Sequence, residues 1–149
     1  MADEFKNVWI SIYKDFEDNL GTVSNIDLPG VDFDTDAFTE WFRPRLLGPA
    51  GGPARRGERN EIWTLDVGCF AKVGEDFTGA QKEILHRHWT LADAVFGQYS
   101  QADIAVKNWA GVGDPVIAHM RFEEASMVQI ERDTMTKQVT VTVAGRLIF

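Results

Sequence analysis

Cysteine is nearly absent from this chain of 149 residues. The single cysteine, Cys69, excludes an internal disulfide and any metal cluster built on several cysteines. No apolar run approaches the ~20 residues that a membrane-spanning helix needs. The first six residues lack the basic-then-apolar order of a signal peptide. These absences predict a protein that is made and used in a cytoplasm, without a membrane partner.

Motifs that carry a known chemistry are also missing. Neither a Gly-x-Ser-x-Gly nucleophile elbow nor a His-Glu-x-x-His metal site occurs. Asp32, Asp34 and Asp36 have the spacing that opens a calcium loop. However, Ala37 stands where that loop needs glycine, and Arg43 stands where it needs glutamate. We therefore expect no enzymatic activity, no cofactor and no metal site.

Acidic side chains are abundant and unevenly placed. The formal net charge is -8, and residues 1–40 hold ten acidic and two basic side chains, which accounts for all of it. Basic side chains gather just after this acidic opening: Arg43, Arg45, Arg55, Arg56 and Arg59. These two regions are either solvated faces or complementary surfaces of neighbouring subunits. The overall acidity argues against a dedicated nucleic-acid binder.

Two stretches have the periodicity of amphipathic helices. In residues 3–20, apolar side chains recur every three or four positions and form one stripe. Its members are Phe5, Val8, Trp9, Ile12, Phe16 and Leu20. Gly21 is a suitable C-terminal stop. A second helix is predicted over residues 80–99, with an apolar face broad enough to cover a sheet. His88 lies on that face and is interpreted as a hydrogen-bonded residue at the boundary of the core.

A long hairpin is the centre of the predicted organisation. Its first arm covers 39–47, its second arm covers 61–73, and the loop over 48–60 is rich in glycine, proline and arginine and is predicted to be flexible. Pro44 indicates that the first arm is an edge or bulged strand. In the second arm, alternate residues form the expected core face. These are Trp63, Leu65, Val67, Cys69 and Ala71.

Three more strands are predicted after the second helix. The first covers 102–109, and the second is long or broken around 122–126. The last places Val139, Val141, Val143 and Leu147 on one side. The whole chain, 1–149, is therefore predicted to be one α+β domain. Its single mixed, mostly antiparallel sheet has about five strands, with two helices packed on one face and a long hairpin loop.

In order and spacing, these features resemble the tail terminator proteins of long-tailed bacteriophages, the family of the lambda-type minor tail protein U. The resemblance covers nearly the whole chain. It includes the N-terminal helix, Pro29-Gly-Val-Asp-Phe33, Trp41-Phe-Arg-Pro-Arg-Leu-Leu47, the arginine-bearing loop, and Gly74-Glu-Asp-Phe-Thr-Gly79 before the long helix. The resemblance implies a ring, usually hexameric, that caps the tail tube and stops its polymerisation. The ring also presents a surface to head-completion proteins while DNA passes through its hole. The implied location is the virion tail, after assembly in the host cytoplasm.

The candidate residues for subunit contacts, tube contacts or the lining of the lumen follow from this resemblance. They are Trp41, Arg43, Arg45, Arg55, Arg56 and Arg59. The alternatives for them are solvated loop charges for the arginines and core packing for the tryptophan. Two other functions stay open. One is another neck component, such as a head–tail connector or stopper. The other is a small α+β enzyme or ligand-binding domain, with His88, His119 and Asp66 as its candidate polar groups.

Overall fold

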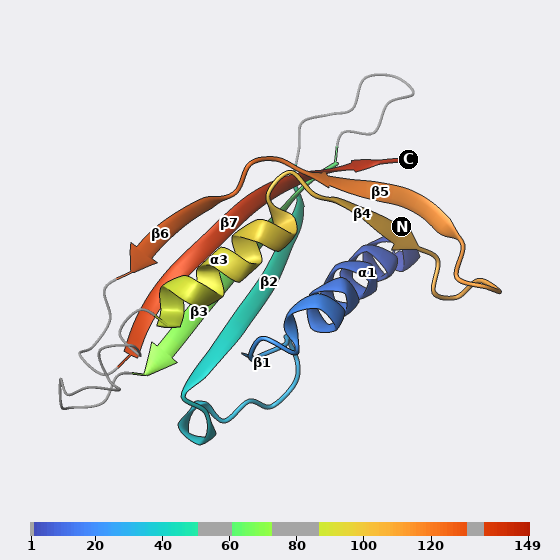
Figure 1. The fold of residues 1–149 in the computed structure, drawn as a ribbon. Coiled ribbons are helices and arrows are strands. Elements are labelled where there is room, and N and C mark those ends of the chain that lie inside the picture. Colours follow the sequence, from blue (N-terminus) through green and yellow to red (C-terminus); the bar gives the residue numbers. More distant parts are fainter. Residues whose placement is uncertain (1, 51–60, 73–86, 131–135) are drawn as a thin grey trace.

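A computed structural model describes residues 2–50, 61–72, 87–130 and 136–149 (Figure 1). Within them lie helices α1 (Ala2–Leu20) and α3 (Arg87–Tyr99), a short 3-10 helix (Thr35–Ala37) and one seven-stranded sheet. The strands are β1 (Asn25–Ile26), β2 (Glu40–Ala50), β3 (Glu61–Lys72), β4 (Asp103–Lys107), β5 (Val116–Phe122), β6 (Ser126–Ile130) and β7 (Thr136–Ile148). The α+β class is confirmed. None of the described helices is long and apolar enough to cross a membrane.

The sheet has the order β1-β2-β3-β7-β5-β4, and β6 pairs with β7 beside this path. β1 and β2 are parallel, and the other pairs are antiparallel. The expected number of about five strands is too low for two reasons. The predicted long strand is divided into β5 and β6, which pair with successive halves of β7. β1 has two residues, too few to show any periodicity in the sequence.

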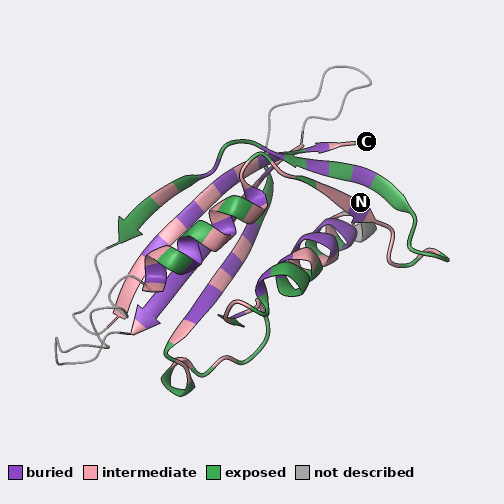
Figure 2. Ribbon diagram, viewed as in Figure 1, coloured by how far each residue is buried: buried purple, intermediate pink, exposed green. Residues whose placement is uncertain are grey.

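One face of the sheet carries the apolar core. The expected core face of β3 is confirmed, because Trp63, Leu65 and Val67 are fully buried. Val67 is paired with Val141 of β7, and Leu65 with Val143, so that apolar rows run across the strands. Both helices cover this face of the curled sheet, and buried positions alternate along β7 (Figures 1 and 2). The expected packing of two helices on one face is therefore confirmed.

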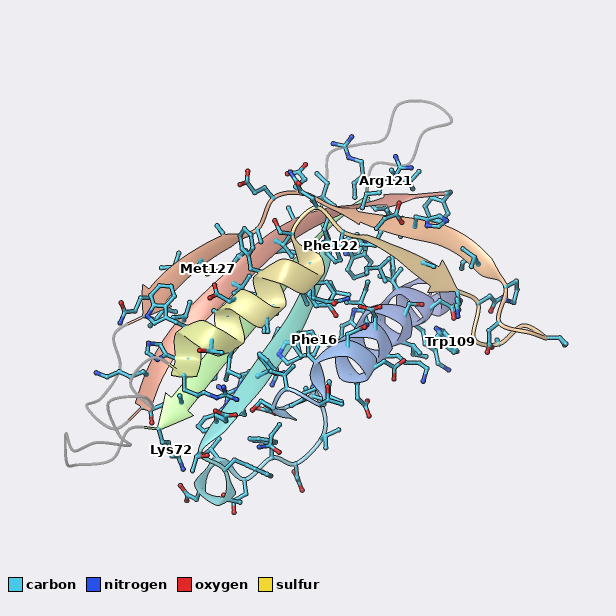
Figure 3. The ribbon with its side chains drawn as sticks, viewed as in Figure 1. Phe16, Lys72, Trp109, Arg121, Phe122 and Met127 are labelled. Atoms are coloured by element: carbon cyan, nitrogen blue, oxygen red, sulfur yellow. The ribbon has the colours of Figure 1, made fainter. Side chains whose placement is uncertain are left out.

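Phe16 lies where α1, α3 and β2 meet (Figure 3). Its ring stacks on Tyr99 of α3 at 5.7 Å and meets Phe42 of β2 edge-to-face at 5.5 Å. Burial of such a ring typically contributes about 1.5–3 kcal/mol relative to exposure. The predicted stripe of α1 is wrong at one position, since Trp9 is 46% exposed. It contacts Tyr13 on the side of the helix instead of entering the core.

The boundaries of two predicted elements also need correction. β2 ends at Ala50 instead of Leu47, with a register shift between those two residues. Pro44 does lie at the edge of the sheet, because β1 pairs with only Trp41 and Phe42 of β2. The described part of the second helix begins at Arg87. Residues 80–86 of that prediction, and 51–60 of the predicted flexible loop, lie outside the described residues.

Candidate functional site

Three of the six candidate residues lie together on β2. Trp41, Arg43 and Arg45 alternate along the strand and face away from the helices, opposite Phe70, Gly68 and Asp66 of β3. This face is called the outer face below. The other three candidates, Arg55, Arg56 and Arg59, lie outside the described residues.

Arg43 and Arg45 both contact Asp27, in the segment that follows β1. The Nε of Arg43 donates to Oδ2 of Asp27 at 2.7 Å, and Nη1 of Arg45 donates to the Asp27 backbone oxygen at 2.8 Å. Asp27 is buried, and its own amide donates to the Phe42 oxygen at 2.8 Å. A buried carboxylate needs such partners, because leaving it unpaired is costly. The two arginines therefore hold the chain after β1 against β2.

Other acidic residues of the opening are also paired within the chain. Glu40 accepts two hydrogen bonds from Arg87 of α3, at 2.6 and 3.1 Å. The Lys72 ammonium lies 4.0 Å from the Asp36 carboxylate and donates to the Thr35 oxygen. Part of the uneven charge seen in the sequence is thus matched inside one subunit. Charge complementarity between neighbouring subunits stays a prediction.

Trp41 belongs to a small aromatic cluster on the outer face. Its ring stacks on Phe70 at 5.2 Å and lies 6.1 Å from Phe33, which stacks on Phe38 at 4.7 Å. The Arg43 guanidinium lies over Phe70 at 4.9 Å. Trp41 is only 3% exposed, so its role in this subunit is to hold the 33–38 segment on the sheet. This cluster was not predicted from the sequence; the available signal was Phe70, an aromatic residue on the more polar side of β3.

The candidate polar groups of an enzyme or ligand site come from different parts of the fold. His88 is buried on α3, which covers the core face. Asp66 is on the outer face and accepts a hydrogen bond from Thr142 Oγ1 at 2.7 Å. The exposed His119 on β5 has its Nδ1 2.8 Å from Asp103 Oδ1. The structure does not gather these three side chains into one pocket. In the described part of the chain, no group of three or more His, Cys, Asp or Glu residues could hold a metal ion.

Cys69 is a core residue, as expected. It is fully buried on β3, and burial raises the pKa of its thiol well above the ordinary value. A thiol that stays protonated is a poor nucleophile. Its position therefore suits packing and not catalysis.

A groove of about 250 Å³ lies between α1 and β4. Ser11 Oγ accepts hydrogen bonds from the Lys107 amide and from the Trp109 indole, both at 3.0 Å. Lys14 and Lys107 lie on the Trp109 ring at 5.9 and 5.8 Å from its centroid. On the helix side, Asp15 accepts from the Tyr99 hydroxyl at 3.0 Å, and burial raises the pKa of this carboxyl. Acidic and basic side chains both line the groove, and their contacts join α1 to the sheet.

Large apolar side chains are exposed at two projecting parts of the sheet. At the connection of β4 and β5, Val112 is fully exposed, and Val116 and Ile117 are also exposed. On β6, Val128 and Ile130 are exposed. Figure 1 shows these parts at opposite ends of the molecule, and Figure 2 shows both as exposed. These residues were not predicted as a surface from the sequence, because strand alternation alone does not show where a strand extends past the body of the protein.

Comparison with known proteins gives the fold but no function. A solved structure without a functional description is similar over 93% of this chain and 94% of that chain, with a TM-score of 0.57 and 13% sequence identity. No family model matches the chain. No curated protein matches it either. At this level of identity, the likeness is one of fold alone.

Proposed function

We propose that this protein is a structural component of a bacteriophage virion, a tail terminator whose subunits form a ring. The ring, a hexamer as in the family that the sequence resembles, caps the tail tube and stops its polymerisation. It then offers a joining surface to the head-completion proteins, and the genomic DNA passes through its lumen without sequence-specific binding. The terminator role comes from the resemblance of the sequence.

The observation that carries an assembly role is the exposure of apolar side chains at both ends of the sheet. Monomeric soluble proteins rarely expose large contiguous apolar patches, and such patches commonly mark interaction sites. A head-to-tail ring needs two different contact surfaces on every subunit. Val112 and Val116 at one end, and Val128 at the other, supply apolar groups to two such surfaces.

The candidate arginines have different parts in this proposal. Arg43 and Arg45 remain about one-third exposed while they bind Asp27, so they present charge on the outer face at fixed positions. Trp41 is buried on the same face, where it packs against Phe33 and Phe70. Arg55, Arg56 and Arg59 are proposed to contact a neighbouring subunit or the tube, or to line the lumen.

A charge reversal in the arginine loop tests these roles. We expect the double variant Arg55→Glu, Arg56→Glu to keep the circular dichroism spectrum of the wild type and to lose tail-completion activity. The matched control is Arg121→Glu with Arg146→Glu, an exposed cross-strand pair of arginines on β5 and β7. It makes the same change in net charge on strands of the sheet instead of in the loop. A fully active loop variant contradicts the proposed role of the loop.

A further inference from the structure

The sheet has edges at β1 and the part of β2 beyond it, at β4 and at β6, and contacts within the chain occupy parts of the β2 and β4 edges. On β2 beyond β1, Pro44 has no N–H, and its backbone oxygen accepts from Arg45 Nη1 at 2.7 Å. The next outward amide, that of Leu46, donates to the Tyr13 hydroxyl oxygen at 2.7 Å. Proline and side-chain contacts of this kind prevent another strand from pairing with an edge.

Helix α1 covers the C-terminal end of the edge at β4. The Lys107 amide donates to Ser11 Oγ at 3.0 Å, and the Trp109 amide, just after the strand, donates to Asn7 Oδ1 at 3.1 Å. Both Asn7 and Ser11 are buried polar residues on α1. Two outward backbone donors at the end of β4 are therefore already bonded to the helix.

The edge at β6 is different. The Ala144 oxygen of β7 accepts from the Glu123 amide at 2.8 Å, so the even-numbered residues of this part of β7 direct their backbone groups toward β6. Ser126 is paired with Thr142, and Val128 with Thr140, so their backbone groups point back toward β7. Met127 and Gln129 consequently direct their amides and carbonyls outward. Among the described strands, β6 pairs with β7 alone.

The sequence of β6 also lacks the usual protection of an exposed edge. Its five residues, Ser-Met-Val-Gln-Ile, include no proline and no charge. Val128 is 58% exposed on the outer face, and Ile130 is exposed beside it. Natural proteins usually place lysine, proline or a bulge at such an edge to prevent pairing with other chains.

We propose that β6 pairs antiparallel with β6 of a second copy of this chain, about a two-fold axis at Val128. In this register, Met127 of each copy is opposite Gln129 of the other. Both residues direct their backbone groups outward, so the two pairs make four hydrogen bonds. Val128 is opposite Val128 of the second copy in a pair without hydrogen bonds, where side chains approach most closely. The edge is thus complementary to itself.

Two further observations favour a second copy as the partner. The protein carries a net charge of -8, yet β6 has no charged residue, so self-pairing places no like charges opposite each other. At the edges of β2 and β4, several outward backbone positions are already occupied by Pro44, Tyr13 and helix α1, whereas β6 offers an uninterrupted edge that matches its own register. The contact closes at two copies, whereas the proposed ring needs head-to-tail contacts. Both contacts would bury Val128, so the β6 pair is proposed for the free protein, before it joins a ring. A free protein without this pair leaves the proposed ring untouched.

Cysteine cross-linking tests the register directly. In a pair without hydrogen bonds the two Cα atoms are about 4.5 Å apart, within the span of a disulfide. We expect the full-length Val128→Cys variant to form a disulfide-linked dimer under mild oxidation. The matched control Val116→Cys replaces a valine of similar exposure, 51%, at the other end of the sheet and is expected to stay monomeric. Equal cross-linking of the two variants overturns the proposal.

A proline substitution tests the backbone pairing without a cysteine. Gln129→Pro removes an outward N–H that makes no hydrogen bond within the sheet, so the fold should tolerate it. The loss of two of the four intermolecular hydrogen bonds should raise the dimer dissociation constant by at least about tenfold in sedimentation experiments. Gln129→Ala keeps the N–H and is expected to dimerise like the wild type. A wild type that stays monomeric across the concentration series, or a proline variant that dimerises equally well, contradicts the proposal.

Discussion

The contact between Arg43 and Asp27 offers a quantitative test of how burial strengthens an ion pair in this fold. The two variants are Arg43→Met, which keeps the apolar stem beside Phe70, and Asp27→Asn, which keeps the shape of the side chain. The Asp27 side chain is 11% exposed and the Arg43 side chain 35% exposed. Exposed pairs contribute about 0–1 kcal/mol, whereas breaking a fully buried pair costs about 3–5 kcal/mol. This pair lies between the two cases, and we expect a coupling free energy of about 1–2 kcal/mol.

The coupling is measured as a double-mutant cycle by urea denaturation of the wild type, the two single variants and the double variant. The same cycle on Arg121 and Asp103 is the control, because those side chains are 65% and 49% exposed at an N–O distance of 3.3 Å. We expect its coupling to be within experimental error of zero. Equal coupling in both cycles would refute the reasoning, since burial would then not distinguish the pairs.

Two further predictions concern packing and pH. Gly145→Ala should lower the free energy of unfolding by about 1–3 kcal/mol in urea denaturation, because its Cβ would lie 2.7 Å from Met120 Sδ and 2.8 Å from the Phe122 ring. In the control Gly97→Ala on α3, the added Cβ meets no atom within 4 Å, and the free energy of unfolding should rise by up to about 1 kcal/mol. A Gly145→Ala variant as stable as the wild type would contradict the close packing of Gly145 against Met120 and Phe122. Burial raises the pKa of Tyr13 and Tyr99 above the ordinary 10.0. Their raised values stabilise the folded state below the unfolded pKa, and this stability is lost as pH rises through the folded pKa. Thermal unfolding should show a falling midpoint above about pH 10, and a constant midpoint up to pH 12 would oppose this.

The parts of the fold that the sequence analysis predicted are those with local periodicity. The alternation in β3 identified Trp63, Leu65 and Val67 as core residues, and all are buried. The three- and four-residue spacing in α1 identified Ile12 and Phe16 in the same way. Such patterns depend only on the geometry of one helix or one strand.

The features that were missed depend on contacts between distant parts of the chain. Asp27 meets Arg43 sixteen residues later, and Ser11 meets Lys107 ninety-six residues later. Neither pair has a signature in the local sequence. Phe70 lies on the more polar side of β3, and it is covered by the Trp41 ring and the Arg43 guanidinium of β2. The open edge of β6 likewise depends on strand order, which periodicity does not specify.

The most direct test of the proposed terminator role is to mix the purified protein with self-assembled tail tubes and to image the tube ends by negative-stain electron microscopy. The proposal predicts a ring at one end of each tube and no further growth of the tube from that end. Bare tube ends here, with the protein bound to isolated portal complexes in a parallel mixture, would indicate a connector or stopper instead. Tubes that keep growing without a ring, while the protein remains unbound, would contradict the proposed function.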